Sequence, residues 1–313
     1  MLGPIGGVQS ARWQTLEQGA QYCTDHGVNL AWQFTNEPGG PPRFRRIMPR
    51  AKIGYRRVYT GHDPAPGLRG LLPSDAQYVL NMRGEITPLI KHTSLRGAVA
   101  YSFANGADWF EKWWNAEYSQ VQGVDYFSFA NEWFLNGQSR ERVSGFAQFY
   151  IELMEACRTH GVVCTVGDFS VGTPGLPSIP QEANDIEWLA PMFDTAQRLG
   201  MPANFHTYDL PDPTGGIMPR EYTWLRWLPY VKRWPNLRIW GGEAGPEGSG
   251  LFRDDAPVRI QTYADVMWNL LNLEAGCWWC ICDPVVQKNP EGDWSGDDWT
   301  PILPWYFSWA AQR

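Results

Sequence analysis

The chain has 313 residues, of which 43% are hydrophobic, enough for a large core that needs neither a metal nor a disulfide to hold it. Its 33 acidic and 26 basic residues give a net charge of −7, which argues against nucleic acid and anionic membranes as partners. No apolar run reaches the roughly 18 residues of a membrane span and no signal peptide is visible, so we expect a cytoplasmic protein or a secreted one whose signal has been removed.

Short apolar runs alternate with helical patterns over the first 60 residues. Gly27 ends the first helical pattern, as glycine often does just past a helix terminus. Proline and glycine cluster at residues 38–42 and indicate a loop. Strands are predicted at 2–9, 28–34 and 52–59, and helices at 10–23 and 43–48.

The pattern loosens between residues 60 and 123. Proline and glycine indicate a long loop, which is followed by a predicted helix at 75–90, a strand at 98–104 and a Trp-rich helix at 108–120. This is more chain than a minimal barrel needs between two strands, so we interpret it as an elaborated connection before the fourth strand. The alternative count makes 98–104 the third barrel strand and removes one earlier strand.

From residue 123 onward, strand and helix patterns alternate regularly, and no linker divides the chain. Such alternation predicts parallel strands with helices outside them. We therefore predict an α/β protein with one (β/α)8 TIM barrel domain over residues 1–313. The predicted strands are 126–133, 162–169, 203–208, 237–243 and 276–282, and the predicted helices are 138–160, 186–199, 220–233, 257–274 and 305–312.

Two of these predicted strands reach a glutamate at their end, Glu132 in one and Glu243 in the other. In a parallel barrel the carboxyl ends of the strands meet at one face, where catalytic groups lie. A pair of carboxylates flanking a sugar can cleave a glycosidic bond, one moving a proton and the other attacking the sugar. Either glutamate alone could be an ordinary helix-start carboxylate, but two such strand ends together indicate a catalytic pair.

Polar and aromatic residues follow the other strands in the same way. The 18 Trp residues are a mild indication of carbohydrate binding, because indole rings stack on sugar faces, although each could equally fill the core. The candidate substrate-binding residues near the strand ends are Asn131, Trp133, Asp168, His206, Tyr208, Trp278 and Trp279.

Three strand ends resemble motifs of the clan A glycoside hydrolases. Phe-Ala-Asn-Glu-Trp at 129–133 resembles the strand-four signature of that clan, and Ile-Trp-Gly-Gly-Glu at 239–243 resembles its strand-seven end. Phe-His-Thr-Tyr at 205–208 resembles its His-x-Tyr motif on strand six. The resemblance implies a retaining glycosidase in which Glu132 is the acid/base and Glu243 is the nucleophile.

The same resemblance implies roles for neighbouring residues. Asn131 would hold the 2-hydroxyl of the sugar, and Tyr208 would hydrogen-bond the nucleophile. The chain departs from the pattern at Trp133, where proline is frequent. The motif also does not show whether Trp278 or Trp279 faces the sugar, which leaves the donor subsite open.

The implied reaction requires one protonated and one ionised glutamate. Arg57, on the third strand, is the candidate for a positive charge beside the nucleophile, with Arg56 pointing to the opposite face; a surface salt bridge is the alternative role of Arg57. The expected substrate is an oligo- or polysaccharide with β-glycosidic bonds, and no metal or organic cofactor is expected. The sequence leaves open the sugar, its linkage and the oligomeric state.

Other interpretations compete with this one. Asn36-Glu37-Pro38 matches the acid/base tripeptide of the clan, but it comes too early for a fourth strand. An inactive barrel that binds carbohydrate or cell wall is the alternative function. A metal-dependent barrel enzyme fits less well, because catalytic zinc usually has several His ligands and a single His ends a strand here.

The chain contains six cysteines, including Cys277, Cys280 and Cys282 in one apolar run. Cys277 and Cys280 have the spacing of a zinc half-site, but no second pair of Cys or His is spaced to complete it. We therefore predict buried thiols that pack as small hydrophobic groups, and the even count leaves disulfide pairing open.

Overall fold

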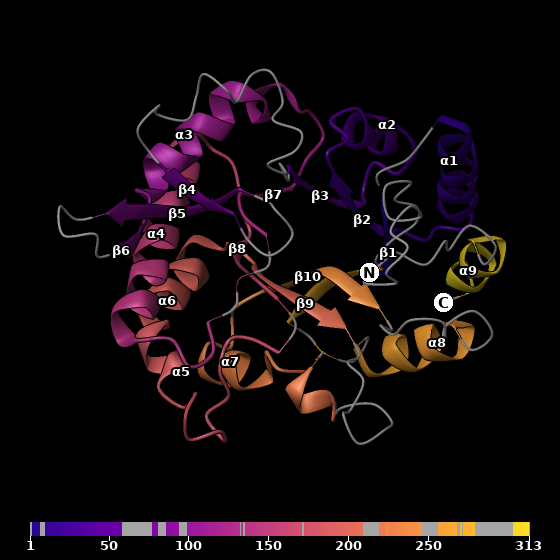
Figure 1. The fold of residues 1–313 in the computed structure, drawn as a ribbon. Helices are drawn as coiled ribbons and strands as arrows, with labels where there is room; N and C mark the ends of the chain where they lie inside the picture. The colour runs from indigo at the N-terminus through magenta and orange to yellow at the C-terminus, as the bar shows by residue number, and fades with distance from the viewer. Residues whose placement is uncertain are drawn as a thin grey trace, which may run out of the picture.

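Parallel strands form the centre of the protein (Figure 1). The computed structural model describes residues 2–6, 10–57, 77–80, 86–93, 99–131, 133, 135–170, 172–208, 219–223, 225–245, 256–267, 270, 272–278 and 303–312. Within these ranges, eight parallel strands lie in the order β7-β3-β2-β1-β11-β10-β9-β8. Their bounds are β1 Leu2–Gly6, β2 Ala31–Thr35, β3 Lys52–Arg56, β7 Tyr126–Ser128, β8 Val166–Phe169, β9 Ala203–Tyr208, β10 Ile239–Gly245 and β11 Leu273–Trp278.

Backbone hydrogen bonds also join β7 to the segment that leads into β8, at the two ends of this order. The amide of Phe127 donates to the carbonyl of Val163 at 3.0 Å, and the amide of Thr165 donates to the carbonyl of Phe127 at 2.9 Å. A second parallel bridge joins Trp133 to Phe169. The strands are thus linked into a ring, and the predicted (β/α)8 barrel is confirmed.

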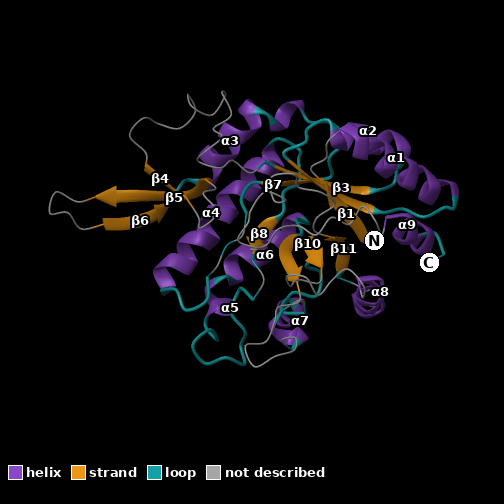
Figure 2. Cartoon of the chain, turned by 45° about the vertical axis from the view of Figure 1, so that its right-hand side comes forward, coloured by secondary structure: helices purple, strands orange, loops and turns teal. Residues whose placement is uncertain are grey.

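Helices surround the strands in both views of the chain (Figures 1 and 2). The predicted helix at 138–160 is confirmed as α4: Ser139 accepts a hydrogen bond from the amide of Arg142 at its start, and Phe146, Phe149 and Tyr150 are buried on its inner face. No helix among the described residues combines the length and apolar character needed to cross a membrane. The helices are α1 Ser10–Asp25, α2 Gly40–Ile47, α3 Gly106–Ala116, α4 Arg140–Thr159, α5 Asp185–Trp188, α6 Ala190–Leu199, α7 Leu228–Arg233, α8 Ala256–Met267 and α9 Leu303–Ala310, with 3₁₀ turns η1 Tyr118–Gln120 and η2 Arg220–Tyr222.

The elaborated connection between β3 and β7 carries a small antiparallel sheet, β4 Gln77–Leu80, β5 Ile86–Thr93 and β6 Val99–Phe103. Figure 2 shows this sheet projecting beside α4. The prediction of a helix at 75–90 is wrong, because Pro88 and the β-branched residues of this stretch suit a strand. The ring of Phe103 packs 5.4 Å from Trp133 and 5.8 Å from Phe146, which anchors the sheet to the barrel.

A small apolar cluster fills the interior of the barrel, and it consists of Ala31, Tyr126, Trp240, Ala275 and Cys277. The rings of Tyr126 and Trp240 meet edge to face at 5.0 Å. Most other aromatic residues lie in the larger core between strands and helices, so much of the Trp content is structural.

The cysteines agree with the prediction of buried thiols as far as the chain is described. Cys23, Cys157, Cys164 and Cys277 are free and buried. Burial raises the pKa of the Cys23 thiol to about 11, as expected for a thiol packed among apolar groups. Cys280 and Cys282 lie outside the described residues.

Gly54 lies against Gln33 and Trp240 inside the barrel, where there is no space for a larger side chain. Replacing it with Ala would place a methyl group against Oε1 of Gln33 and 2.9 Å from Cζ2 of Trp240, the two groups that share a hydrogen bond of 3.0 Å. We expect Gly54→Ala to lower the free energy of unfolding by about 1–3 kcal/mol, measured by urea denaturation. Gly39→Ala is the control: no atom lies within 4 Å of its added methyl, so a change of less than about 0.5 kcal/mol is expected. Equal effects of the two substitutions would contradict the packing described here.

Candidate active site

A buried carboxylate lies at the carboxyl end of the barrel strands. Glu243, in the second half of β10, is 1% exposed. Its Oε1 forms an ion pair with Nη2 of Arg56, and its Oε2 lies 3.3 Å from Nδ1 of His206. The guanidinium favours the anionic form of this carboxylate, because an opposite charge in contact offsets the loss of water.

Arg56 is itself held in place from two sides. It is the last residue of β3 and is 2% exposed. Its Nε donates to Oγ1 of Thr35 at 2.9 Å, and its Nη1 donates to Oδ1 of Asn131 at 2.7 Å. One guanidinium therefore connects Glu243 to Asn131, bringing together the strand-seven and strand-four motifs of the sequence.

The positive charge beside Glu243 comes from Arg56. The prediction that Arg57 supplies this charge is therefore wrong by one residue. Arg57 donates to the carbonyl of Asn36 at 3.1 Å and lies 3.4 Å from a carboxylate oxygen of Glu117. Strand alternation could have identified Arg56: Tyr55 packs in the outer core, so its two neighbours on the strand, Gly54 and Arg56, share the inner face.

Several predicted site residues are described only in part. Glu132 and Trp279 lie outside the described residues, as do the side chains of Tyr208 and Trp278. Tyr208 ends β9 in register with Gly245 of β10. Trp278 ends β11.

Trp133 and Asp168 are buried within the protein. Trp133 is 6% exposed, and its ring packs 5.4 Å from Phe103 and 5.5 Å from Phe146. This packing makes Trp133 part of the core that joins α4 to the small sheet. Asp168, at 1% exposure, accepts hydrogen bonds on both of its carboxylate oxygens, from the side chains of Tyr150, Thr165 and Asn204.

Two further predictions can be placed. Glu37 follows β2 and so does not lie at the end of the fourth barrel strand. Among the described residues, no group of three or more His, Cys, Asp or Glu could hold a metal ion.

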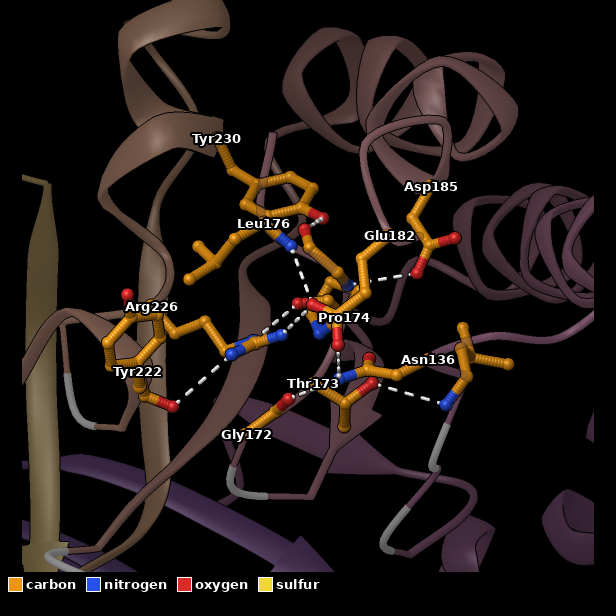
Figure 3. Close-up of polar contacts among 12 residues, drawn as sticks. Asn136, Gly172, Thr173, Pro174, Leu176, Glu182, Asp185, Tyr222, Arg226 and Tyr230 are labelled. Carbon is orange, nitrogen blue, oxygen red and sulfur yellow. Dashed lines mark hydrogen bonds and ion pairs between the residues drawn. The ribbon is translucent and has the colours of Figure 1, made fainter. Parts of the chain in front are cut away.

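A buried polar cluster joins the loops that follow β7, β8 and β9 (Figure 3). Its centre is Arg226, 4% exposed, which donates to Oε2 of Glu182 at 2.5 Å and to the carbonyl of Pro174 at 2.6 Å. Asn136 donates to the other oxygen of Glu182 at 3.0 Å and to the carbonyl of Gly172 at 2.6 Å. The sequence gives no sign of this cluster, because its members lie far apart in the chain and share no motif.

Asp185 completes the cluster by accepting a hydrogen bond from the amide of Gly175 at 3.0 Å. Burial raises its pKa from 3.8 to about 6, and nearby Glu182 adds to this shift. The folded protein therefore binds the proton of the Asp185 carboxyl group more tightly than the unfolded chain does. The contribution of Asp185 to stability is most favourable below pH 3.8 and is lost as the pH rises through about 6.

We expect Asp185→Asn to raise the unfolding free energy by about 1–3 kcal/mol at pH 8, since it removes the cost of burying the anion. The gain should vanish near pH 4, and thermal melts across this range would measure it. Glu187→Gln is the control, because Arg233 lowers the pKa of the exposed Glu187 and its removal should give no gain at pH 8. A gain independent of pH at Asp185 would contradict this account.

No protein-family model matches the chain, and no curated protein matches it in sequence. Its structure is similar to that of an endo-β-1,4-glucanase from Xanthomonas axonopodis pv. citri, with 12% identity, a TM-score of 0.50, and coverage of 99% of this chain and 98% of the glucanase. A β-mannanase from Thermomonospora fusca matches at 12% identity and a TM-score of 0.46, covering 94% of this chain and 80% of the mannanase. The catalytic domain of a β-amylase from Paenibacillus polymyxa matches at 9% identity and a TM-score of 0.46, covering 99% and 98%. At 12% identity, the similarity to the glucanase shows a shared α/β barrel fold.

Proposed function

We propose that this protein is a retaining glycoside hydrolase in which Glu243 is the nucleophile and Glu132 the acid/base. The observation that carries the proposal is the buried contact of Glu243 with Arg56 and His206 at the carboxyl end of the barrel strands. A carboxylate kept ionised in this position can attack a sugar carbon and form a covalent glycosyl-enzyme.

The acid/base assignment rests on sequence and on the neighbours of Glu132. Asn131, which precedes it, accepts a hydrogen bond of 2.7 Å from the same guanidinium that holds Glu243. In the proposed reaction, Glu132 protonates the departing oxygen and then removes a proton from the water that hydrolyses the glycosyl-enzyme. These two glutamates should lie about 5–5.5 Å apart, as in other retaining enzymes.

We infer that the substrate is an oligo- or polysaccharide with β-glycosidic bonds. The support is the resemblance of the motifs at residues 129–133, 205–208 and 239–243 to those of the clan. The fold shared with a protein described as an endo-β-1,4-glucanase agrees with this substrate class. The reaction as proposed uses only side chains of this chain and water.

Glu243→Ala should reduce kcat by at least about 10³-fold on every substrate that the wild type cleaves, because no nucleophile remains. The rates of 4-nitrophenyl β-glycosides would measure this, with circular dichroism confirming the fold. Glu37→Ala is the matched control, since Glu37 follows β2 in the other Asn-Glu pair and should not be needed. Loss of activity in Glu37→Ala with activity retained in Glu243→Ala would contradict the assignment of Glu243 as the nucleophile.

Glu132→Ala should affect substrates according to their leaving group. The loss in kcat/KM should be about 10²–10⁴-fold on unactivated oligosaccharides, which need a proton donor, and small on 2,4-dinitrophenyl glycosides, which do not. Azide should accelerate turnover of the variant and give a β-glycosyl azide product, because the small anion fits the space left by the carboxylate. Equal losses on the two substrate classes, without rescue by azide, would contradict an acid/base role.

A further inference from the structure

The strand that carries Glu243 breaks the usual alternation of inward and outward side chains. Trp240 faces the barrel interior, where it meets Tyr126 at 5.0 Å and donates to Gln33 at 3.0 Å. Glu243, three residues later, also faces inward, towards Arg56. In a regular strand, residues three apart lie on opposite faces, so β10 must change phase between these two residues.

The strand register locates this change. Trp240 pairs with Asn204 of β9, and the next pair is Glu243 with His206. Gly241 and Gly242 therefore stand opposite a single residue of β9, which is a β-bulge. Without the bulge, Ala244 would take the inward position and Glu243 would turn towards the helices.

Glycine is required at the bulge because the space beside it is occupied. A methyl group on Gly242 would lie 2.6 Å from Oδ1 of Asn204. A methyl group on Gly241 would lie 3.1 Å from the carbonyl oxygen of Ala275. The two consecutive glycines before Glu243 thus allow the backbone to pass close to both neighbouring strands.

The side chain of Asn204 holds the bulge from inside the barrel. Asn204 is 1% exposed, and its Oδ1 accepts a hydrogen bond of 2.9 Å from the amide of Gly242. Its Nδ2 donates to Oδ1 of Asp168 at 2.7 Å. An amide is the group that can accept from a backbone N–H on one side and donate to a carboxylate on the other.

Asp168 is held in turn by side chains from α4 and from the segment before β8. Its Oδ2 accepts from the hydroxyl of Tyr150 at 2.8 Å, and its Oδ1 accepts from the hydroxyl of Thr165 at 3.0 Å. Its backbone has φ of +38°, which is unusual for a residue other than glycine, and its carbonyl accepts from the amide of Trp133 at 3.0 Å. Asn204 therefore bonds to a carboxylate on β8 whose own position is determined by Tyr150 of α4, by Thr165 and by the backbone of Trp133.

We propose that Asn204 is a positioning residue for Glu243: it locks the Gly241–Gly242 bulge and so aims the carboxylate at the sugar. It acts through the amide of Gly242 and does not contact the substrate. Its effect on rate rests on the proposed function, whereas its effect on the position of Glu243 is a matter of geometry.

The test compares Asn204→Ala with Asn272→Ala. Asn272 also binds the chain that leads into β10, donating to the carbonyls of Pro235 and Leu237 at 2.8 and 2.9 Å, but at the opposite end of the strand. The substrates are the 2,4-dinitrophenyl β-glycosides of glucose, mannose and cellobiose, because their leaving group needs no proton and the first step reports attack by Glu243. Asn204→Ala should lower kcat/KM about 10–100-fold, and Asn272→Ala should stay within about twofold of wild type, with melting temperatures lowered to a similar extent.

Asn204→Asp serves as the conservative variant and covers the case in which Asn204→Ala does not fold. One proton shared between residues 204 and 168 can replace the lost N–H donor, while the new carboxyl still accepts from the amide of Gly242. This variant should recover most of the rate at pH 5–6 and lose it as that proton dissociates. A rate within twofold of wild type in Asn204→Ala, or in Asn204→Asp above the pH at which that proton dissociates, would overturn the proposal, as would an equal loss in Asn272→Ala.

Crystal structures of the same variants separate this inference from the proposed function. If none of the glycosides is cleaved by the wild type, the assignment as a glycosidase for these sugars fails, and the structures decide on Asn204 alone. In Asn204→Ala, a Glu243 carboxylate moved out of contact with Arg56 supports the positioning role. A carboxylate still paired with Arg56 and His206 overturns it.

Discussion

The buried ion pair between Arg56 and Glu243 is the contact on which the rest of the site depends. Both side chains are at most 3% exposed, so each would be strongly destabilising without the other. The barrel makes the pair possible because it brings the carboxyl ends of β3 and β10 to the same face. Nε and Nη1 of the guanidinium donate to Thr35 and Asn131, so the arginine is held on both sides of its contact with Glu243.

The barrel interior is divided into two layers of different chemistry. Nearer the amino ends of the strands, Tyr126 and Trp240 belong to a cluster that excludes water. Nearer the carboxyl ends, charged and amide side chains make a connected set of hydrogen bonds that reaches Glu243. The bulge in β10 lies between these layers. It allows one strand to contribute an indole to the apolar layer and a carboxylate to the polar one.

The fold and part of the site follow from local sequence patterns, and the rest depends on distant contacts. The barrel was predictable because each buried parallel strand is a short apolar run between amphipathic helices such as α4. The small sheet before β7 was missed as a sheet, since its antiparallel pairs and its packing on Trp133 are not local signals. Choosing Arg57 over Arg56 was an error of phase by one residue, which reverses the face of a strand. The cluster around Arg226 has no signature in the sequence, because its polar groups come from distant segments and become partners only in the folded protein.

The central claim is that the Glu243 carboxylate attacks the sugar carbon. The most direct measurement is to incubate the protein with a 2,4-dinitrophenyl 2-deoxy-2-fluoro-β-glycoside, which slows hydrolysis of the glycosyl-enzyme, and to locate the adduct by peptide mass spectrometry and crystallography. We expect one fluorosugar per chain, bonded through an ester to the side chain of Glu243, with Arg56 still beside it. An adduct on another carboxylate, or hydrolysis that inverts the anomeric configuration and leaves no adduct, would contradict it.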